Sequence, residues 1–219
     1  MQALLDRLEA YYGVQTPGWP TDPYEFLIWW HCGYPASDAK CSRGWESLNQ
    51  SIGIRPEQIL GESIPELARA LKAGGMVPEQ RAMRLKHIAE RATSGIGFLT
   101  AGSEPALRRQ LKTFPNIGDP GADRILLFGD LVAVAAVPSN CPHVLVRILR
   151  GRELENYNQN YRAAQEAIEA HIPADFAPRK RVYLLLKQHG QELCKRANPR
   201  CEVCPLSSQC AFFRRANAS

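Results

Sequence analysis

Four cysteines near the C-terminus place the strongest constraint on how this chain can fold. Cys194, Cys201, Cys204 and Cys210 follow the pattern C-x6-C-x2-C-x5-C. Paired Cys-x2-Cys knuckles are typical of structural zinc. Here one knuckle has a single, more distant thiolate on each side, which suits the separated corners of a [4Fe–4S] cluster. A zinc ribbon and two disulfides are the alternatives.

Length and composition favour an ordinary folded protein. The 219 residues with 45% hydrophobic content can bury a core as one large domain or two small ones. Residues 1–12 place apolar residues at helical spacing interrupted by acids, which predicts neither a signal nor a transit peptide. We therefore expect a cytoplasmic protein without membrane association. In a reducing compartment, the odd total of seven cysteines leaves Cys32, Cys41 and Cys141 as expected buried thiols.

Positive charge is concentrated around the cysteines. Residues 179–219 hold nine lysines and arginines against two acids, Glu192 and Glu202, while the whole chain carries +5. A basic patch around a metal loop is what a phosphate backbone would attract. The plain alternative is a solvated basic face.

The rest of the chain predicts one helix after another. Asp22 and Pro23 mark a helix start before the apolar run 26–30, and Ser63 with Glu66 forms a capping-box pattern. Further helices are expected over residues 79–93, over 106–111 after a start at 103–105, and around the apolar stretch 182–186, with a stop at 74–75. No segment alternates convincingly as a strand does. The sequence therefore predicts an all-α fold.

A turn between two predicted helices is the second functional feature. It reads Phe114-Pro115-Asn116-Ile117-Gly118, followed by Asp119-Pro120-Gly121. A short hairpin with a buried Ile117 would let successive backbone N–H groups face outward and form a phosphate site with the next helix N-terminus. We expect Asp119 to cap that helix and Pro120 to occupy its first turn. An ordinary helix–helix turn is the alternative.

Together, the hairpin and the cysteine array resemble the endonuclease III-like helix–hairpin–helix DNA glycosylases (the HhH-GPD superfamily), which are base-excision repair enzymes. Phe114-Pro-Asn-Ile-Gly118 is similar to the family's Leu-Pro-Gly-Val-Gly hairpin, and residues 189–190 lead into the same cysteine spacing. Residues 23–28, 75–78 and 144–147 match other family segments. The resemblance covers nearly the whole chain and implies a [4Fe–4S] cluster on Cys194, Cys201, Cys204 and Cys210.

The resemblance also implies an architecture and a partner. A six-helix barrel would span residues 19–132 and contain the helix–hairpin–helix at about 104–129; residues 1–18 and 133–219 would form the iron–sulfur domain. Double-stranded DNA would lie between them, bound by a nucleoid-associated, monomeric protein. The expected DNA-binding residues are the wedge Met76 and the hairpin positions Pro115, Asn116, Ile117, Gly118 and Gly121, with the target nucleotide extruded into a pocket.

The departures from the family concern its catalytic residues. An ungapped alignment places Pro120 at the position of the lysine that attacks the sugar in bifunctional members, and Pro138 at the position of the catalytic aspartate. Pro35 stands where the family commonly has a DNA-inserting glutamine. Without an amine at 120 there is no Schiff base there.

Four residues are candidate replacements for the missing groups. Asn140 could orient water, and His143 could act as a base, its ordinary pKa being near 6.5. Tyr34 and Asp38 would face the flipped base; the structural alternatives are packing for Tyr34 and a helix cap for Asp38. His31 reads as a satisfied core histidine.

Two functions follow from this pattern. One is a monofunctional glycosylase that hydrolyses the N-glycosidic bond of a damaged or mismatched base without strand cleavage, which the aromatic residues near Tyr34 favour. The other is a non-catalytic protein that binds DNA lesions or unusual structures, which Pro138 favours.

Overall fold

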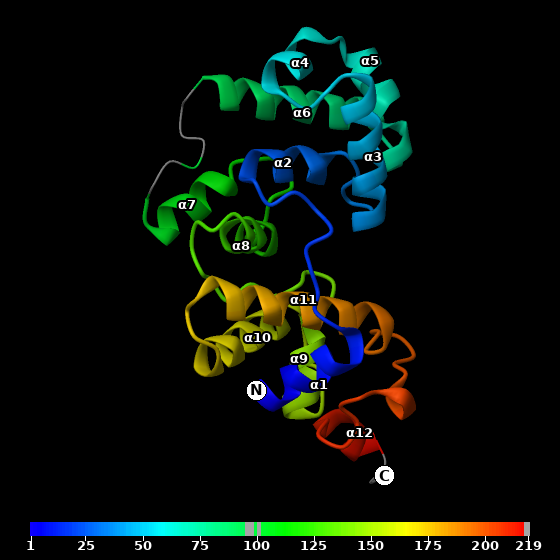
Figure 1. Cartoon of the computed structure of the whole chain (residues 1–219), viewed down its shortest axis with the longest axis vertical. Helices are drawn as coiled ribbons and strands as arrows, with labels where there is room; N and C mark the ends of the chain where they lie inside the picture. Colours follow the sequence, from blue (N-terminus) through cyan, green and yellow to red (C-terminus); the bar gives the residue numbers. More distant parts are fainter. Residues whose placement is uncertain (95–98, 100–101, 217–219) are drawn as a thin grey trace. The chain divides into compact units, whose positions relative to one another are not determined.

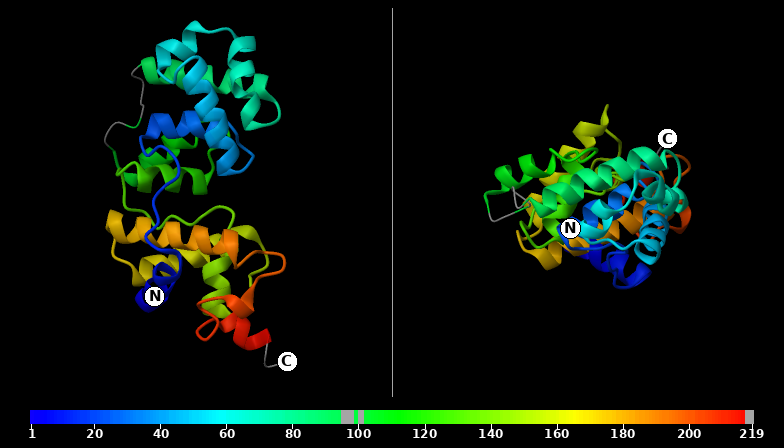
Figure 2. Two further views of the ribbon diagram at one scale, coloured as in Figure 1. Left: turned by 45° about the vertical axis from the view of Figure 1, so that its right-hand side comes forward. Right: turned by 90° about the horizontal axis from the view of Figure 1, so that it is seen from above.

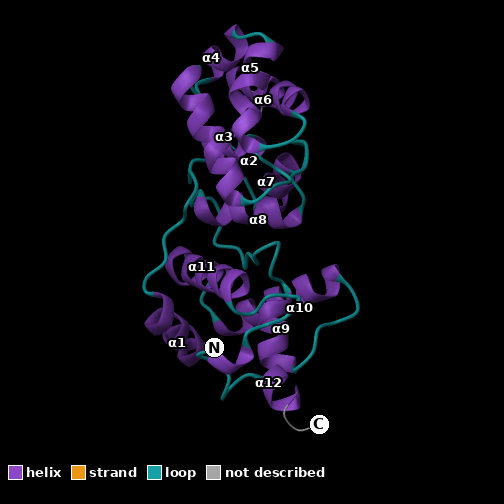
Figure 3. Ribbon diagram, turned by 90° about the vertical axis from the view of Figure 1, so that its right-hand side faces the viewer, coloured by secondary structure: helices purple, strands orange, loops and turns teal. Residues whose placement is uncertain are grey.

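The computed structural model describes residues 1–94, 99 and 102–216, and every regular element within these ranges is a helix (Figure 1). Colouring by secondary structure shows helices joined only by loops (Figure 3). The predicted all-α class is therefore confirmed. No helix in these ranges is both long and apolar enough to cross a membrane.

The chain folds into two compact units. One consists of Pro17–Ile117, and the other of Met1–Thr16 with Gly118–Ser219. The second break lies at Gly118, whereas the sequence interpretation put it after residue 132. The stretch between contains α8 (Asp119–Phe128), which packs on α11 (Phe176–Glu192) in the unit that holds the termini.

The Pro17–Ile117 unit is built around α6 (Pro78–Thr93), against which α2, α4 and α5 pack (Figure 2). Helix α3 packs on α2 and on the 3-10 turn η1. The remaining elements are α2 (Pro23–His31), α3 (Asp38–Ser51), α4 (Pro56–Gly61), α5 (Ile64–Ala70), η1 (Leu71–Gly74) and α7 (Glu104–Leu111).

Local capping explains where several of these helices begin. The Asp22 side chain accepts a hydrogen bond from the Glu25 amide at 3.0 Å, and Ser63 accepts one from the Glu66 amide at 3.3 Å. Each bond satisfies an amide that the first helical turn leaves unpaired. The predicted starts at Asp22 and Ser63 are confirmed.

Two helix N-caps were predicted one residue too far along the sequence. Ser37, not Asp38, is the N-cap of α3, and Gly118, not Asp119, is the N-cap of α8. In both cases the preceding residue is the last one with extended backbone, so the acid falls inside the first turn. A carboxylate in the first turn still favours the helix through the macrodipole.

The other unit closes a core between the N-terminal helix and the C-terminal half of the chain. Helix α1 (Gln2–Tyr12) packs on α11, and α9 (His143–Arg150) contacts α10 (Tyr157–His171), α11 and α12 (Ala211–Ala216). Leu4, Leu5 and Leu8 enter the same buried cluster as Leu206 and Cys210. The cysteine segment therefore shares its core with α1. Its one regular turn is η2 (Cys201–Val203).

Candidate functional site

The hairpin is anchored by two apolar side chains and presents its tip to solvent. Phe114 and Ile117 are buried, whereas Asn116 and Gly118 are exposed. The Ile117 amide donates to the Phe114 carbonyl at 3.3 Å, and Asn116 takes the left-handed conformation with φ of 58°. Asparagine adopts that region more readily than most residues. The backbone thus reverses direction just before α8, and Gly121 is buried in that helix's first turns.

Two basic side chains hold the hairpin in place. The ring of His31, at the end of α2, is fully buried; Nε2 contacts the Pro115 carbonyl oxygen at 2.8 Å and Nδ1 the Leu27 carbonyl oxygen at 2.7 Å. Arg91 lies 3.7 Å above the Phe114 ring and donates to Thr113 Oγ1 at 2.7 Å. Burial lowers the pKa of His31, and the two carbonyls oppose that shift. His31 is thus a hydrogen-bonded core residue that contacts the hairpin directly.

A strained turn displays Met76. Its side chain is 86% exposed, and the next residue, Val77, has φ of 51°, which is unusual for a β-branched side chain. The fully buried Arg81 donates from Nη2 to the Gly75 carbonyl at 2.5 Å and from Nη1 to the Cys32 carbonyl. A strained backbone persists only where surrounding contacts determine it, and such turns cluster at functional sites.

The two prolines that the sequence alignment sets at the expected catalytic positions, Pro120 and Pro138, lie in or next to helices. Pro120 is half-buried in the first turn of α8, and Pro138 is buried before α9. Of the candidate replacements, Asn140 is exposed close to Pro138. Tyr34 is half-buried and stacks on Trp30 with ring centroids 4.7 Å apart, and Asp38 lies in the first turn of α3.

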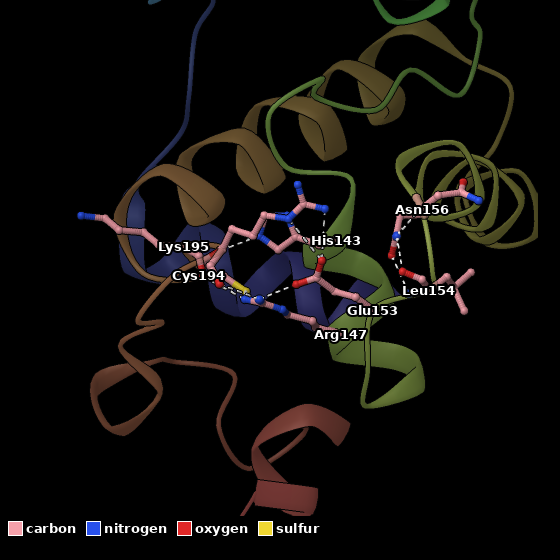
Figure 4. Close-up of polar contacts among 9 residues, drawn as sticks. His143, Arg147, Glu153, Leu154, Asn156, Cys194 and Lys195 are labelled. Atoms are coloured by element: carbon pink, nitrogen blue, oxygen red, sulfur yellow. Dashed lines mark hydrogen bonds and ion pairs between the residues drawn. The ribbon is translucent and has the colours of Figure 1, made fainter.

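His143 has an environment unlike that of a free general base. It is buried at the start of α9, and its Nε2 contacts the Cys194 carbonyl oxygen at 2.9 Å. Burial lowers its pKa, and the nearby Arg147 acts in the same direction. This placement favours a role in holding the cysteine loop (Figure 4).

Arg147 is the main anchor of the first cysteine. Its guanidinium is buried and donates to the carbonyls of Lys195 and Arg196, each at 2.9 Å, while its Nη1 lies 4.0 Å from the Cys194 sulfur. It also pairs with Glu153, as Figure 4 shows. Burial raises the pKa of the Cys194 thiol to about 12, and Arg147 opposes that rise. The sequence identified Arg147 only as part of a segment that resembles a family helix. The carbonyls that it binds lie far along the chain, so no local pattern predicts these contacts.

The four cysteines line one cavity, together with Arg147, His189 and apolar side chains such as Phe212. No disulfide joins any of the seven cysteines, all of which lie in the described ranges, so the disulfide alternative finds no support. Cys32, Cys41 and Cys141 are buried as predicted. In the described ranges, no group of three or more His, Cys, Asp or Glu side chains could hold a single metal ion. Four thiols around one cavity are a donor set that would fit a multi-iron group rather than a single ion.

A buried carboxylate network supports α8 just after the hairpin. Asp123 is fully buried; its Oδ2 accepts from the Tyr161 hydroxyl at 2.6 Å and from Gln165 Nε2 at 3.0 Å. Gln165 also reaches the Ala135 carbonyl at 3.3 Å. The network ties α8 and α10 to the segment that leads to Pro138. Sequence analysis missed it, because its members lie about forty residues apart and carry no motif.

The chain is similar in sequence to known proteins over most of its length. No protein-family model matches the chain. It is 26% identical over 199 residues to endonuclease III of Thermotoga maritima, covering 89% of this chain and 85% of that protein. It is 26% identical over 161 residues to the thymine/uracil-DNA glycosylase of Methanothermobacter thermautotrophicus, covering 74% and 69%.

Two solved structures match the fold of this chain over almost its full length. A non-covalent endonuclease III–DNA complex matches with a TM-score of 0.76 at 17% identity, covering 100% of this chain and 97% of that one. A thermostable thymine-DNA glycosylase matches with a TM-score of 0.74 at 19% identity, covering 98% and 96%. The chain therefore has the helix–hairpin–helix fold of endonuclease III. The predicted resemblance to the endonuclease III-like DNA glycosylase family is confirmed.

Proposed function

We propose that this protein is a DNA glycosylase of base-excision repair that acts as a monofunctional enzyme. The observation that carries the proposal is the hairpin, whose exposed tip is held by buried anchors in a chain whose relatives are named thymine/uracil-DNA glycosylase and endonuclease III. Backbone amides at such a tip can bind phosphates without side-chain charge. Pro115, Asn116, Ile117, Gly118 and Gly121 would form this contact.

Met76 would act as the wedge that enters the base stack of double-stranded DNA. Its exposure and the rigid turn beneath it support this role. Inserted apolar side chains unstack bases, and the cost is offset by new contacts. Cations on the cysteine loop would add phosphate contacts; Lys195, Arg196 and Arg200 are exposed there. We propose a monomer whose functional domains are residues 19–132, which contain the whole helix–hairpin–helix, and residues 1–18 with 133–219. This is a division by function and differs from the compact units, which divide after Ile117.

Hydrolysis without strand cleavage follows from the residue at position 120. Proline has no side-chain amine with which to form a Schiff base at this position, and in the proposed reaction a water would attack the sugar instead. Asn140, exposed two residues after Pro138, is the candidate that would orient this water. Tyr34 and Asp38 would contact the extruded base. His143 remains a weaker candidate, since its Nε2 already contacts a carbonyl.

We also propose a [4Fe–4S] cluster on Cys194, Cys201, Cys204 and Cys210. Their common cavity and free thiols support it. When bound, the cluster would hold the cysteine loop in one conformation. Anaerobic purification followed by iron and sulfide analysis would test this; a stoichiometric zinc content without iron would replace the cluster with the zinc alternative.

A cleavage panel tests the activity. Labelled duplexes carrying uracil, a thymine–guanine mismatch, oxidised, alkylated or deaminated bases would be incubated with the protein and read with and without hot alkali. Strand breaks that appear only after alkali identify a monofunctional glycosylase and its base. Breaks without alkali would contradict the role assigned to Pro120.

The alternative function is a DNA-binding protein without catalysis, which the loss of an acid at Pro138 favours. No product across the panel, together with salt-sensitive binding to the same duplexes, would support it. Restoring the carboxylate in a Pro138→Asp variant is the matched comparison. Activity gained by that variant alone would show that the fold still delivers a base to this position.

A further inference from the structure

A histidine beside the cysteine cavity contacts both a tyrosine and one of the proposed cluster ligands. His189, on α11, is buried; its Nδ1 lies 3.0 Å from the Tyr12 hydroxyl on α1, and its Nε2 lies 3.7 Å from the Cys204 sulfur. The two rings meet edge to face with centroids 6.0 Å apart. A side chain from the N-terminal helix is therefore connected through one imidazole to the cysteine loop.

The chemistry of these three groups selects one tautomer. A neutral imidazole has one N–H donor and one acceptor nitrogen. A thiolate at Cys204 accepts hydrogen bonds, so an unprotonated Nε2 facing it would be repelled. If the proton is on Nε2, then Nδ1 must accept, and the Tyr12 hydroxyl is the donor in reach. Burial raises the pKa of Tyr12 above its ordinary value, which keeps that hydroxyl protonated.

The backbone holds the histidine firmly at this place. A Cβ added at Gly190 would lie 2.4 Å from the Cys141 sulfur, so the end of α11 packs too closely for a side chain there. The His189 carbonyl accepts the Cys194 amide at 2.8 Å. On the other side, Arg181 of α11 binds Glu9 of α1 at 2.9 Å, beside the Tyr12 turn. His189 thus contacts the first and third cysteines of the array.

We infer that Tyr12 is a positioning residue for the cluster: by donating to Nδ1 it fixes His189 as the Nε2–H tautomer, which donates to the Cys204 sulfur. The inference rests on the proposed [4Fe–4S] cluster. Hydrogen bonds to ligand sulfurs stabilise the more negative, reduced state and so raise the reduction potential of a cluster. They also orient the ligand and slow its release.

The test compares Tyr12→Phe with Tyr11→Phe in the anaerobically purified full chain. Tyr11 is the adjacent, half-exposed tyrosine, whose ring packs edge to face on Tyr12. The histidine Nδ1 contacts the Tyr12 hydroxyl and not that of Tyr11, so Tyr11 controls for a changed phenol on the same helix. We expect Tyr12→Phe to lower the cluster's reduction potential and to speed loss of its visible absorbance in the presence of a chelator. Loss should be faster by roughly tenfold, the lower range for outer-shell partners of metal ligands. Tyr11→Phe should match the wild type in both.

A double-mutant cycle separates this coupling from general loosening of α1. His189→Phe removes the donor to sulfur, so adding Tyr12→Phe to it should change potential and loss rate no further. An equal effect of Tyr12→Phe with and without His189 would overturn the inference, as would an unchanged potential in the single variant. Absence of iron from the wild type would instead overturn the proposed cofactor, which is a distinct outcome.

Discussion

His31 and Pro115 are joined by a 2.8 Å contact between ring Nε2 and the carbonyl oxygen, although 84 residues separate them in the sequence. This contact fixes the second residue of the hairpin from the end of α2. The imidazole is fully buried, so water does not compete for its ring nitrogens. The hairpin's conformation therefore depends on a side chain outside the motif.

Replacing His31 by phenylalanine should loosen the hairpin and weaken DNA binding. The ring volume is kept while both polar contacts are lost, which we expect to cost about 1 kcal/mol in binding, or roughly fivefold in Kd. Fluorescence anisotropy with a labelled duplex measures this. His87→Phe, on the exposed face of α6, is the control and should bind as the wild type does. Equal affinities for the two variants would show that His31 does not support the hairpin.

Stability should fall in acid partly because of His31. Burial holds its pKa below the ordinary value of 6.5, so the unfolded chain binds this proton more readily than the folded protein does. The stability that neutral His31 contributes to the folded protein is complete above a pH of about 6.5, and it is lost as the pH falls toward the lowered pKa. Urea unfolding measures the free energy of unfolding of the wild type and of His31→Phe at neutral and acidic pH. The difference between the two free energies should be smaller at acidic pH. A constant difference would contradict this.

Met76→Ala should separate DNA distortion from stability. Because the side chain is 86% exposed, the free energy of unfolding should stay within about 0.5 kcal/mol of the wild type. The fluorescence of 2-aminopurine placed beside the target base should rise less on binding, since less unstacking occurs. Met83→Ala, at an exposed methionine of α6, is the matched control. A wild-type fluorescence response in Met76→Ala would exclude the wedge role.

Tyr161→Phe should destabilise the unit that holds the termini. It removes a 2.6 Å hydrogen bond to the buried Asp123 carboxylate, and such losses cost about 1–3 kcal/mol. Thermal unfolding gives the shift directly. Tyr157→Phe, whose partly exposed ring stacks on Tyr161 at 6.0 Å, should shift the midpoint much less. Equal shifts would mean that packing, not the hydrogen bond, stabilises α10.

Cys201→Ser should lower iron content, stability and DNA affinity together. A serine at one ligand position weakens the group that would order the cysteine loop and its exposed cations, Lys195 and Arg200. Iron analysis, thermal unfolding and anisotropy test the three effects on one preparation. Cys141→Ala changes a thiol outside the array and should keep its iron. Undiminished binding by a Cys201→Ser protein without iron would contradict the link between cluster and DNA.

Local sequence signals predicted the helices well. Asp22 and Ser63 mark helix starts through bonds to amides three residues away, and the helix expected to start at 103–105 and to run to Leu111 spans Glu104–Leu111. The caps of α3 and α8 were misplaced by one residue, because Ser37 and Gly118 rather than the following acids carry the extended backbone. Capping depends on the path of the preceding loop, which the residue types alone do not determine.

The contacts that the sequence did not predict join residues that lie far apart in the chain. The cysteine spacing indicated a metal loop, but the partners of that loop, Arg147 and Glu153, come from another part of the chain. The same holds for Arg81, whose charge gave no hint that it is buried beneath the Met76 turn. Buried polar groups must find partners wherever the fold supplies them, and a motif contains only its own residues.

The order of the two units along the sequence has a consequence for folding during synthesis on the ribosome. Residues 17–117 form one compact unit and are synthesised before α11, so this unit can begin to fold while translation continues. The N-terminal helix, made first, must wait for α11 and the cysteine segment before its leucines Leu4, Leu5 and Leu8 find their core. Until then these side chains are open to chaperones and proteases. Assembly of that half is therefore a late event, and ribosome stalling near residue 190 should leave a protease-sensitive α1 beside a resistant 17–117 fragment.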